Sequence, residues 1–186
     1  MDFIINIHGK ELDFIQACER NEKWAQKKLY EEHYSQMLGI CMRYSNNKED
    51  ALDIMHDGFI KVLKNISKYQ AGTSLKSWMK RIMVNTAIDF YRKRVRRRTE
   101  DLETAYDLQS YDPDVLSQIS AQGILACLQE LTPAYRSVFS LYVIEGYPHK
   151  EVAQMLGITE STSRSNLVKA RMKLKNILAK KHISRS

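Results

Sequence analysis

The residues best suited to chemistry are flat and cationic side chains that recur every three or four positions along one segment. They are Trp78, Arg81, Asn85, Arg92 and Arg96, and the apolar Ile88 lies at the same spacing among them. This spacing places them on one stripe of a helix. Arginines suit phosphates and flat side chains suit unstacked bases, so the stripe predicts contact with nucleic acid. Trp78 taken alone is better explained as a core residue. The arginines after it, which also include Arg94, are what indicate DNA.

A second candidate DNA-binding element lies between residues 148 and 176. Val152 and Leu156 give a short helix an apolar stripe, and Gly157 supplies the left-handed residue that ends it. Thr159 can cap the next helix, with Glu160 favourably placed near its N-terminus. A short helix, a glycine turn and a longer basic helix predict a helix-turn-helix. The alternative is an ordinary helical hairpin with a solvated face.

The second helix of this pair is expected to separate buried from exposed residues. Arg164 and Ser165 point away from the apolar face and suit base edges or phosphates, and Lys169 lies on the same exposed side. The apolar face is predicted to contain Ser163, Leu167, Ala170, Leu174, Ile177 and Leu178.

No residue pattern supports catalysis. Cys18, Cys41 and Cys127 are far apart, without metal-ligand spacing, so we expect neither disulfides nor zinc, and a reducing interior. A phosphate-binding glycine loop and a nucleophile with its base are both lacking. His56 and Asp57 are adjacent, but neighbours in a helix do not face each other. We expect no enzyme activity, no cofactor, no metal and no small-molecule substrate.

An acidic and apolar face is predicted on the helix after Asn47. Asp53, His56, Asp57 and Ile60 lie opposite its apolar repeat, which includes Met55. An exposed isoleucine among carboxylates suits a protein docking site. A solvated helix face explains the same spacing equally well.

The helices that hold these residues are predicted along the whole chain. One short helix precedes residue 20, and others surround Tyr30–Cys41 and Leu52–Ile66. A loop at residues 68–74 with Ser74 as a cap leads into a helix from Leu75 to about Arg96. Further helices are expected at residues 119–131 and after Thr132, where Pro133 takes the first helical position.

Charge along the 186-residue chain is segregated. The net charge is +7, and six of the seven residues from Arg92 to Arg98 are basic, whereas residues 99–135 contain seven carboxylates and no lysine or arginine. We therefore predict an all-α protein of two small domains, 1–98 and 119–186, joined by a flexible acidic linker at 99–118. Residues 1–10 do not form a secretory signal and no stretch spans a bilayer, so a soluble, cytoplasmic protein is expected.

Three segments in this order resemble a bacterial sigma factor of the extracytoplasmic-function (ECF) type. Residues 53–59, DIMHDGF, are similar to its region 2.2, and residues 77–94, SWMKRIMVNTAIDFYRKR, to regions 2.3 and 2.4. Residues 131–139, LTPAYRSVF, Glu145–Gly146 and the helix-turn-helix resemble region 4. The likeness covers residues 22–180.

The resemblance implies roles for each surface. Asp53, His56 and Asp57, with Ile60 nearby, would bind the β′ clamp helices of core RNA polymerase. The helix from Leu75 and the loop before it would capture unstacked bases of the −10 element. Arg164, Ser165 and Lys169 would contact the −35 element. The linker would thread towards the RNA path and the second domain would rest on the β flap, and an anti-sigma factor would regulate the protein.

This sequence departs from the family pattern at three of these positions. His56 stands where glutamine is usual, Ser163 replaces an apolar residue, and Asn166 sits where a basic residue is frequent. The sequence therefore predicts a sigma factor that directs promoter recognition, DNA melting and transcription initiation. The alternative is a stand-alone regulator that binds an operator through its helix-turn-helix. A nuclease or recombinase would need a metal or nucleophile that the sequence lacks.

Overall fold

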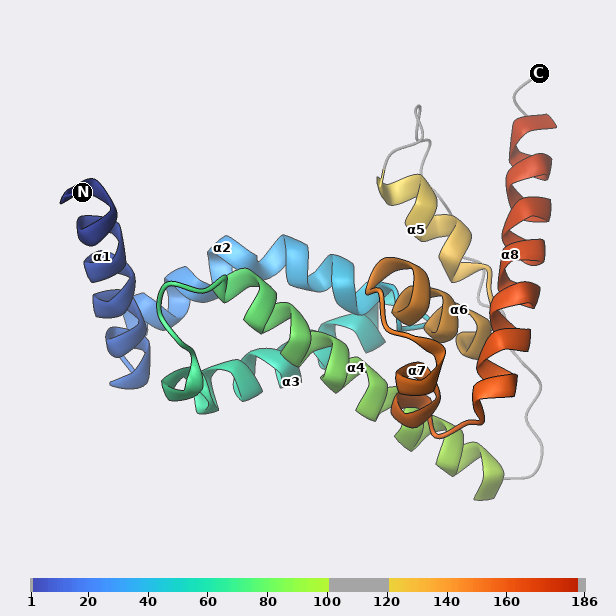
Figure 1. Cartoon of the computed structure of the whole chain (residues 1–186), viewed down its shortest axis with the longest axis horizontal. Coiled ribbons are helices and arrows are strands. Elements are labelled where there is room, and N and C mark those ends of the chain that lie inside the picture. The colour runs from blue at the N-terminus through green and yellow to red at the C-terminus, as the bar shows by residue number, and fades with distance from the viewer. Residues whose placement is uncertain (1, 101–120, 184–186) are drawn as a thin grey trace. The chain divides into compact units, whose positions relative to one another are not determined.

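The computed structural model describes the backbone of residues 2–100 and 121–183, and the side chains of residues 10–97 and 123–180. All regular structure in these ranges is helical (Figure 1). The elements are α1 (Asp2–Glu19), α2 (Lys23–Met42), α3 (Lys48–Lys64), η1 (Ile66–Lys68), α4 (Leu75–Glu100), α5 (Ala121–Gln129), α6 (Pro133–Phe139), η2 (Ser140–Ile144), α7 (His149–Leu156) and α8 (Glu160–Ile183). The predicted all-α class is confirmed. The acidic linker lies, from residue 101 onward, outside the described residues.

The helices form two compact units. The first contains residues 1–41 and 51–87, and the second contains residues 42–50 and 88–186. Within the described residues, none of the helices has the length and apolar character needed to cross a membrane.

The core of the first unit is centred on α3 and α4. Met55 and Val62 of α3 and Met79 and Met83 of α4 are fully buried. Gly58 permits a close approach between these helices, because a Cβ at this position would lie 2.2 Å from the Met83 sulfur. The apolar repeat in α3 is thus buried as predicted, and its opposite face is left exposed.

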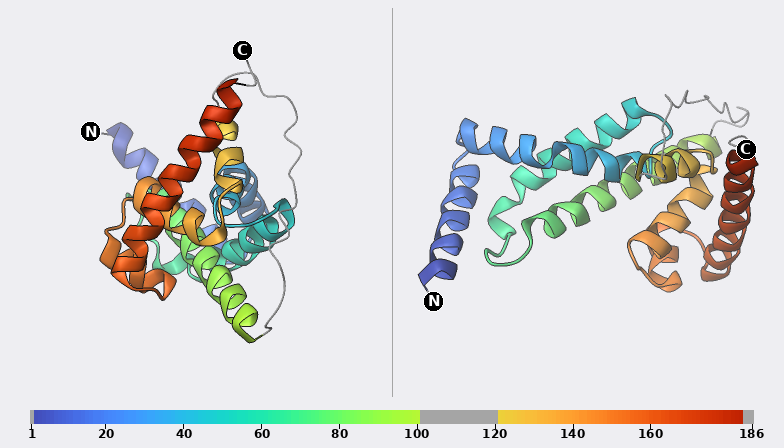
Figure 2. Two further views of the ribbon diagram at one scale, coloured as in Figure 1. Left: turned by 90° about the vertical axis from the view of Figure 1, so that its right-hand side faces the viewer. Right: turned by 90° about the horizontal axis from the view of Figure 1, so that it is seen from above.

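A loop at residues 69–74 connects η1 to α4 and passes beside α1 (Figure 2). Gly72 turns the chain with a φ of 86°, a value that favours glycine. Ser74 then caps α4 as predicted, since its Oγ accepts a hydrogen bond of 3.2 Å from the Ser77 amide.

In the second unit, α8 packs on α5 and α6. Leu128, Leu131 and Ala170 are almost completely buried in its core, and Ile177 is 9% exposed. Pro133 begins α6 as predicted, but the Thr132 side chain makes no capping hydrogen bond. The π-helical turn η2 follows α6 directly.

Two predicted orientations are wrong. Ile88 was expected on the outward stripe of α4 but is 4% exposed. The buried face of α4 is wider there than a single stripe, because Val84 and Ala87 are also buried. Leu178 was expected on the buried face of α8 but is 44% exposed, because the buried face narrows to Leu174 and Ile177 at that level.

Candidate nucleic-acid and polymerase interfaces

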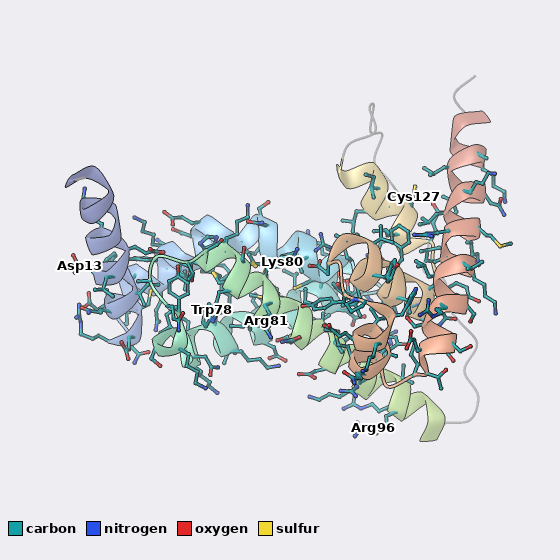
Figure 3. The ribbon with its side chains drawn as sticks, in the orientation of Figure 1. Asp13, Trp78, Lys80, Arg81, Arg96 and Cys127 are labelled. Carbon is teal, nitrogen blue, oxygen red and sulfur yellow. The ribbon has the colours of Figure 1, made fainter. Side chains whose placement is uncertain are left out.

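The first half of the α4 stripe combines an aromatic ring with polar side chains. Trp78 is half-buried, and its ring lies 5.7 Å from the ring of Tyr69, tilted by 57°. Arg81 and Asn85 follow on the same helix and are exposed. Figure 3 shows Trp78 and Arg81 along α4, with Arg96 nearer its C-terminal end. A half-buried indole beside an exposed cation and an amide is a surface that can hold an unstacked base.

The second half of the stripe is basic, and its arginines are not equivalent. Arg92 and Arg96 are exposed. Arg94 is half-buried and forms an ion pair of 2.6 Å with Asp50. The Arg92 guanidinium also has a partner, because it donates a hydrogen bond of 3.4 Å to the Gln154 carbonyl, but this contact is exposed and phosphate can replace it. The exposed Arg96 guanidinium is likewise available to phosphates, whereas Arg94 is held in a half-buried ion pair within the protein.

The acidic and apolar face of α3 is exposed along its length. Asp53, His56 and Asp57 are exposed, and Ile60 has an exposed fraction of 50%. Tyr30 of α2 borders this face, with its hydroxyl 3.3 Å from His56 Nε2 and its ring stacked against the imidazole. Tyr30 is half-buried, at the edge of the face.

The helix-turn-helix is formed by α7 and α8. Gly157 ends α7 in the left-handed conformation with a φ of 69°, and the Ile158 amide donates to the Ala153 carbonyl at 3.0 Å. The Thr159 hydroxyl caps α8 by accepting a bond of 3.1 Å from the Thr162 amide. The glycine turn and the threonine cap both occur where the sequence predicted them.

A buried polar contact joins the two helices of this motif. His149 Nδ1 lies 2.9 Å from the Ser163 hydroxyl, and the Tyr142 ring stacks on the imidazole at 4.2 Å. Burial lowers the pKa of His149, and the charges of Arg164 and Arg171 lower it further, against an opposing effect of Glu160. Neutral histidine therefore anchors the first turn of α7 to the recognition helix. This contact explains why serine stands at an otherwise apolar position.

The proposed reading residues of α8 are on its exposed side. Arg164 pairs with Glu160 at 2.5 Å, with 64% of its side chain exposed. The Ser165 hydroxyl donates to the Thr162 carbonyl at 3.2 Å, and Lys169 is exposed. The pair with Glu160 lies on the surface, where such pairs contribute little stability, so Arg164 can exchange this partner for DNA.

Some residues that shape these surfaces were not found from the sequence. His149 and Tyr69 lie outside any predicted stripe, and Glu11 contacts Tyr69 from α1. Ser163 was a visible signal, since a polar residue on a buried face needs a partner. Glu11 had no comparable signal, because its partners are about sixty positions away.

Among the described residues, no group of three or more His, Cys, Asp or Glu side chains is placed to hold a metal ion. Cys18, Cys41 and Cys127 are buried free thiols.

The fold and its surfaces define a helical DNA-binding protein with a helix-turn-helix and a separate basic, aromatic stripe. Residues 29–97 match the family model of sigma-70 region 2, and residues 121–174 match that of sigma-70 region 4. The chain belongs to the ECF sigma factors, the subunits that bind core RNA polymerase and direct promoter recognition, DNA melting and transcription initiation.

The sequences of several known sigma factors match most of this chain. The ECF sigma factor SigE of Mycolicibacterium smegmatis is 32% identical over 82% of this chain, which spans 61% of that relative's length. SigM of Mycobacterium tuberculosis is 25% identical, with 90% of this chain and 84% of the relative covered. SigV of Bacillus subtilis is 28% identical, with 82% and 90% covered.

The fold also resembles a solved structure. The sigma factor RpoE of Bartonella quintana, crystallised with the anti-sigma factor NepR, aligns with a TM-score of 0.54 and 20% identity. The alignment covers 82% of this chain and 96% of that one. The likeness extends to both helical regions and supports the fold.

Proposed function

We propose that the exposed face of α3 is the part of this sigma factor that docks on the β′ clamp helices of core RNA polymerase. Asp53, His56, Asp57 and Ile60 supply charge and an apolar anchor at its centre. The observation that carries the proposal is Ile60, which remains half-exposed among carboxylates while the opposite side of α3 is buried. An apolar side chain bordered by charged groups gives a partner helix both an apolar and a polar contact.

The stripe on α4 would read and open the −10 element. Trp78, Arg81 and Asn85 would receive unstacked bases, while Arg92 and Arg96 hold the phosphates. Arg94 would join them by sharing its bond to Asp50. Opening a duplex costs a few kcal/mol per unstacked base, and captured bases offset that cost. Promoters whose bases fit this surface would open, and others would remain closed.

The N-terminal part of α8 would read the −35 element. Arg164 is placed to contact base edges or phosphate, with Ser165 beside it and Lys169 one turn further along. The residues would thus divide between a polymerase-binding and −10-binding domain at 1–98 and a −35-binding domain at 119–186. The second domain would also contact the β flap, with the acidic segment at 99–118 as the linker.

The protein would act in the cytoplasm and without catalytic chemistry of its own. Its effect would come from differences in binding energy among promoters. An anti-sigma factor would control its access to polymerase. The solved complex of the Bartonella quintana sigma factor RpoE with the anti-sigma factor NepR supports this part of the proposal.

Transcription by sigma-free core polymerase tests the function directly. We expect discrete new transcripts from a library of native promoter fragments when this protein is added. Asp53→Ala combined with Asp57→Ala should remove them, whereas Lys48→Ala, at an exposed position of the same helix but off this face, should not. Silence, together with tight binding of the isolated protein to duplex DNA, would instead support a stand-alone regulator.

A further inference from the structure

A single carboxylate on α1 holds the loop that leads into the −10 stripe. Glu11 Oε1 accepts a hydrogen bond of 2.7 Å from the Tyr69 hydroxyl, and Oε2 accepts one of 3.1 Å from the Gly72 amide. These two contacts lie at the first and fourth residues of the 69–74 loop. One side chain therefore fixes both the entry of the loop and its turn.

The two hydrogen bonds of Glu11 involve a carboxylate. Hydrogen bonds that involve an ionised carboxylate are shorter and stronger than neutral ones. Tyr69 is 6% exposed, and burial together with Glu11 raises its pKa, so its hydroxyl keeps its hydrogen. The same hydroxyl lies 2.5 Å from the Thr73 carbonyl, so the phenol links Glu11 to the far end of the loop.

The loop has few other means of holding its shape. Thr73 bonds to the Gln70 carbonyl through both its amide and its hydroxyl, which closes a local turn. Residues 70–74 are all exposed. An exposed loop with mainly local bonds opens easily, and opening would move Tyr69, whose ring contacts Trp78.

We propose that Glu11 is a positioning residue for −10 recognition: it presets the 69–74 loop and, through Tyr69, the ring of Trp78, so that an unpaired base meets a surface already formed. This inference rests on the proposed −10 role of α4. It adds α1 to the promoter-reading machinery, although residues 2–28 precede the region 2 match. A preset surface binds more tightly because less ordering remains to be done upon binding.

The test compares holoenzymes on one promoter identified by the transcription library. Glu11→Ala should reduce the discrimination between the native −10 element and single-base changes in it by roughly tenfold, the size expected from hydrogen bonds to a charged group. Discrimination at the −35 element and affinity for core polymerase should stay unchanged. A 2-aminopurine in the non-template −10 strand should report weaker base capture.

Two variants separate positioning from folding. Glu11→Gln should restore most of the discrimination, because its amide oxygen can accept from the Gly72 amide while its amide nitrogen donates to the Tyr69 oxygen. The single hydrogen of the Tyr69 hydroxyl, which Glu11 and the Thr73 carbonyl share in the wild-type protein, would then go to Thr73 alone. Asp13→Ala removes a charge from the same helix at an exposed position away from these contacts and should change nothing (Figure 3).

The outcomes decide between the possibilities. A folded Glu11→Ala protein with normal −10 discrimination overturns the inference. So does a parallel loss at both promoter elements and in polymerase binding, which would mark a purely structural role. Hydrogen exchange at the Gly72 amide, measured without polymerase, tests the contacts of Glu11 with the loop separately. We expect faster exchange of this amide in Glu11→Ala. If the wild-type protein drives no promoter-specific transcription while Glu11 still protects the Gly72 amide from exchange, the proposed function is wrong, but the contact between Glu11 and the loop is confirmed.

Discussion

The helix-turn-helix and the α4 stripe are the two basic surfaces that we propose to contact DNA, but they are held in place differently. In the helix-turn-helix, the turn, the cap and the buried His149–Ser163 contact all lie between residues 149 and 163. The surface around Trp78 depends instead on Tyr69 and on Glu11, which is 58 positions before Tyr69 in the chain. Local sequence is thus enough for one surface, whereas the other needs distant parts of the first unit.

This difference means that packing changes elsewhere in the first unit, including those on helices that pack against α4, should damage the proposed −10 surface and leave the helix-turn-helix intact. The predictions below test that separation, from the largest expected effect to the smallest.

Gly58→Ala should destabilise the first unit. Its new Cβ would lie 2.2 Å from the fully buried Met83 sulfur, and forcing extra carbon into a packed core costs about 1–3 kcal/mol. Urea unfolding of the full chain should show a lower free energy of unfolding. Promoter opening should weaken while −35 discrimination persists.

Gly39→Ala is the matched control for Gly58→Ala. It is also a helical glycine, but a Cβ there meets nothing within 4 Å. Replacing it should stabilise the protein by roughly 0.5–1 kcal/mol, because alanine favours the helix. Equal effects of both substitutions would contradict a close contact between α3 and α4.

Arg164→Ala should reduce discrimination at one position of the −35 element by roughly 1–2 kcal/mol, or about tenfold, as expected for the loss of a base contact. Arg164→Lys should keep the overall affinity but lose the selectivity, because lysine lacks the planar fork. Transcription from a panel of −35 variants measures both.

Lys175→Ala controls for the loss of a positive charge in this experiment, because Lys175 lies about 16 Å from Arg164 along the axis of α8. A uniform loss on all −35 sequences upon Arg164→Ala would assign Arg164 to a phosphate. The helix-turn-helix would then position the protein without reading that base.

Arg96→Ala should lower the slope of log affinity against log salt by about one, the value for a lost phosphate contact. Arg94→Ala should change this slope less and instead reduce stability by about 0.5–1 kcal/mol, because its ion pair with Asp50 is half-buried. Salt titrations of promoter binding and thermal unfolding distinguish the two. Equal slopes for both variants would show that Arg94 leaves Asp50 to contact DNA.

Ser163→Ala should cost about 1 kcal/mol, because it leaves a buried nitrogen of His149 without its partner. Stability should also depend on pH. Above the ordinary His pKa of 6.5 both folded and unfolded states hold a neutral imidazole. As the pH falls below 6.5, His149 takes up a proton in the unfolded chain before it does so in the folded protein. The free energy of unfolding therefore decreases until the pH reaches the lower pKa of His149 in the folded state.

His149→Asn should make the loss of stability between about pH 7 and 5 less steep, because it removes one such group. His33 in the first unit remains as a reference, since burial lowers its pKa too. The charge of Glu32 raises the pKa of His33 by a smaller amount, and that of Lys76 lowers it. Thermal unfolding at several pH values measures the dependence. An unchanged pH profile would show that His149 titrates normally in the folded protein.

The sequence by itself determined those features that are set by neighbouring residues. Gly157 ends α7, Thr159 and Ser74 cap the helices that follow them, and the apolar repeat of α3 faces the core. These depend on backbone geometry and on hydrogen bonds within one or two turns, so a linear pattern contains them. The family resemblance, carried by three local segments in order, was readable for the same reason.

Tertiary structure decided which side chains meet across helices. It buried Ile88, exposed Leu178, paired Arg94 with Asp50 and placed Glu11 on the 69–74 loop. None of these follows from helical periodicity, which fixes the direction of a side chain on its own helix but not what another helix brings to it. The local sequence therefore defines the helix-turn-helix that we propose to read the −35 element, whereas packing in the first unit completes the surface that we propose for the −10 element.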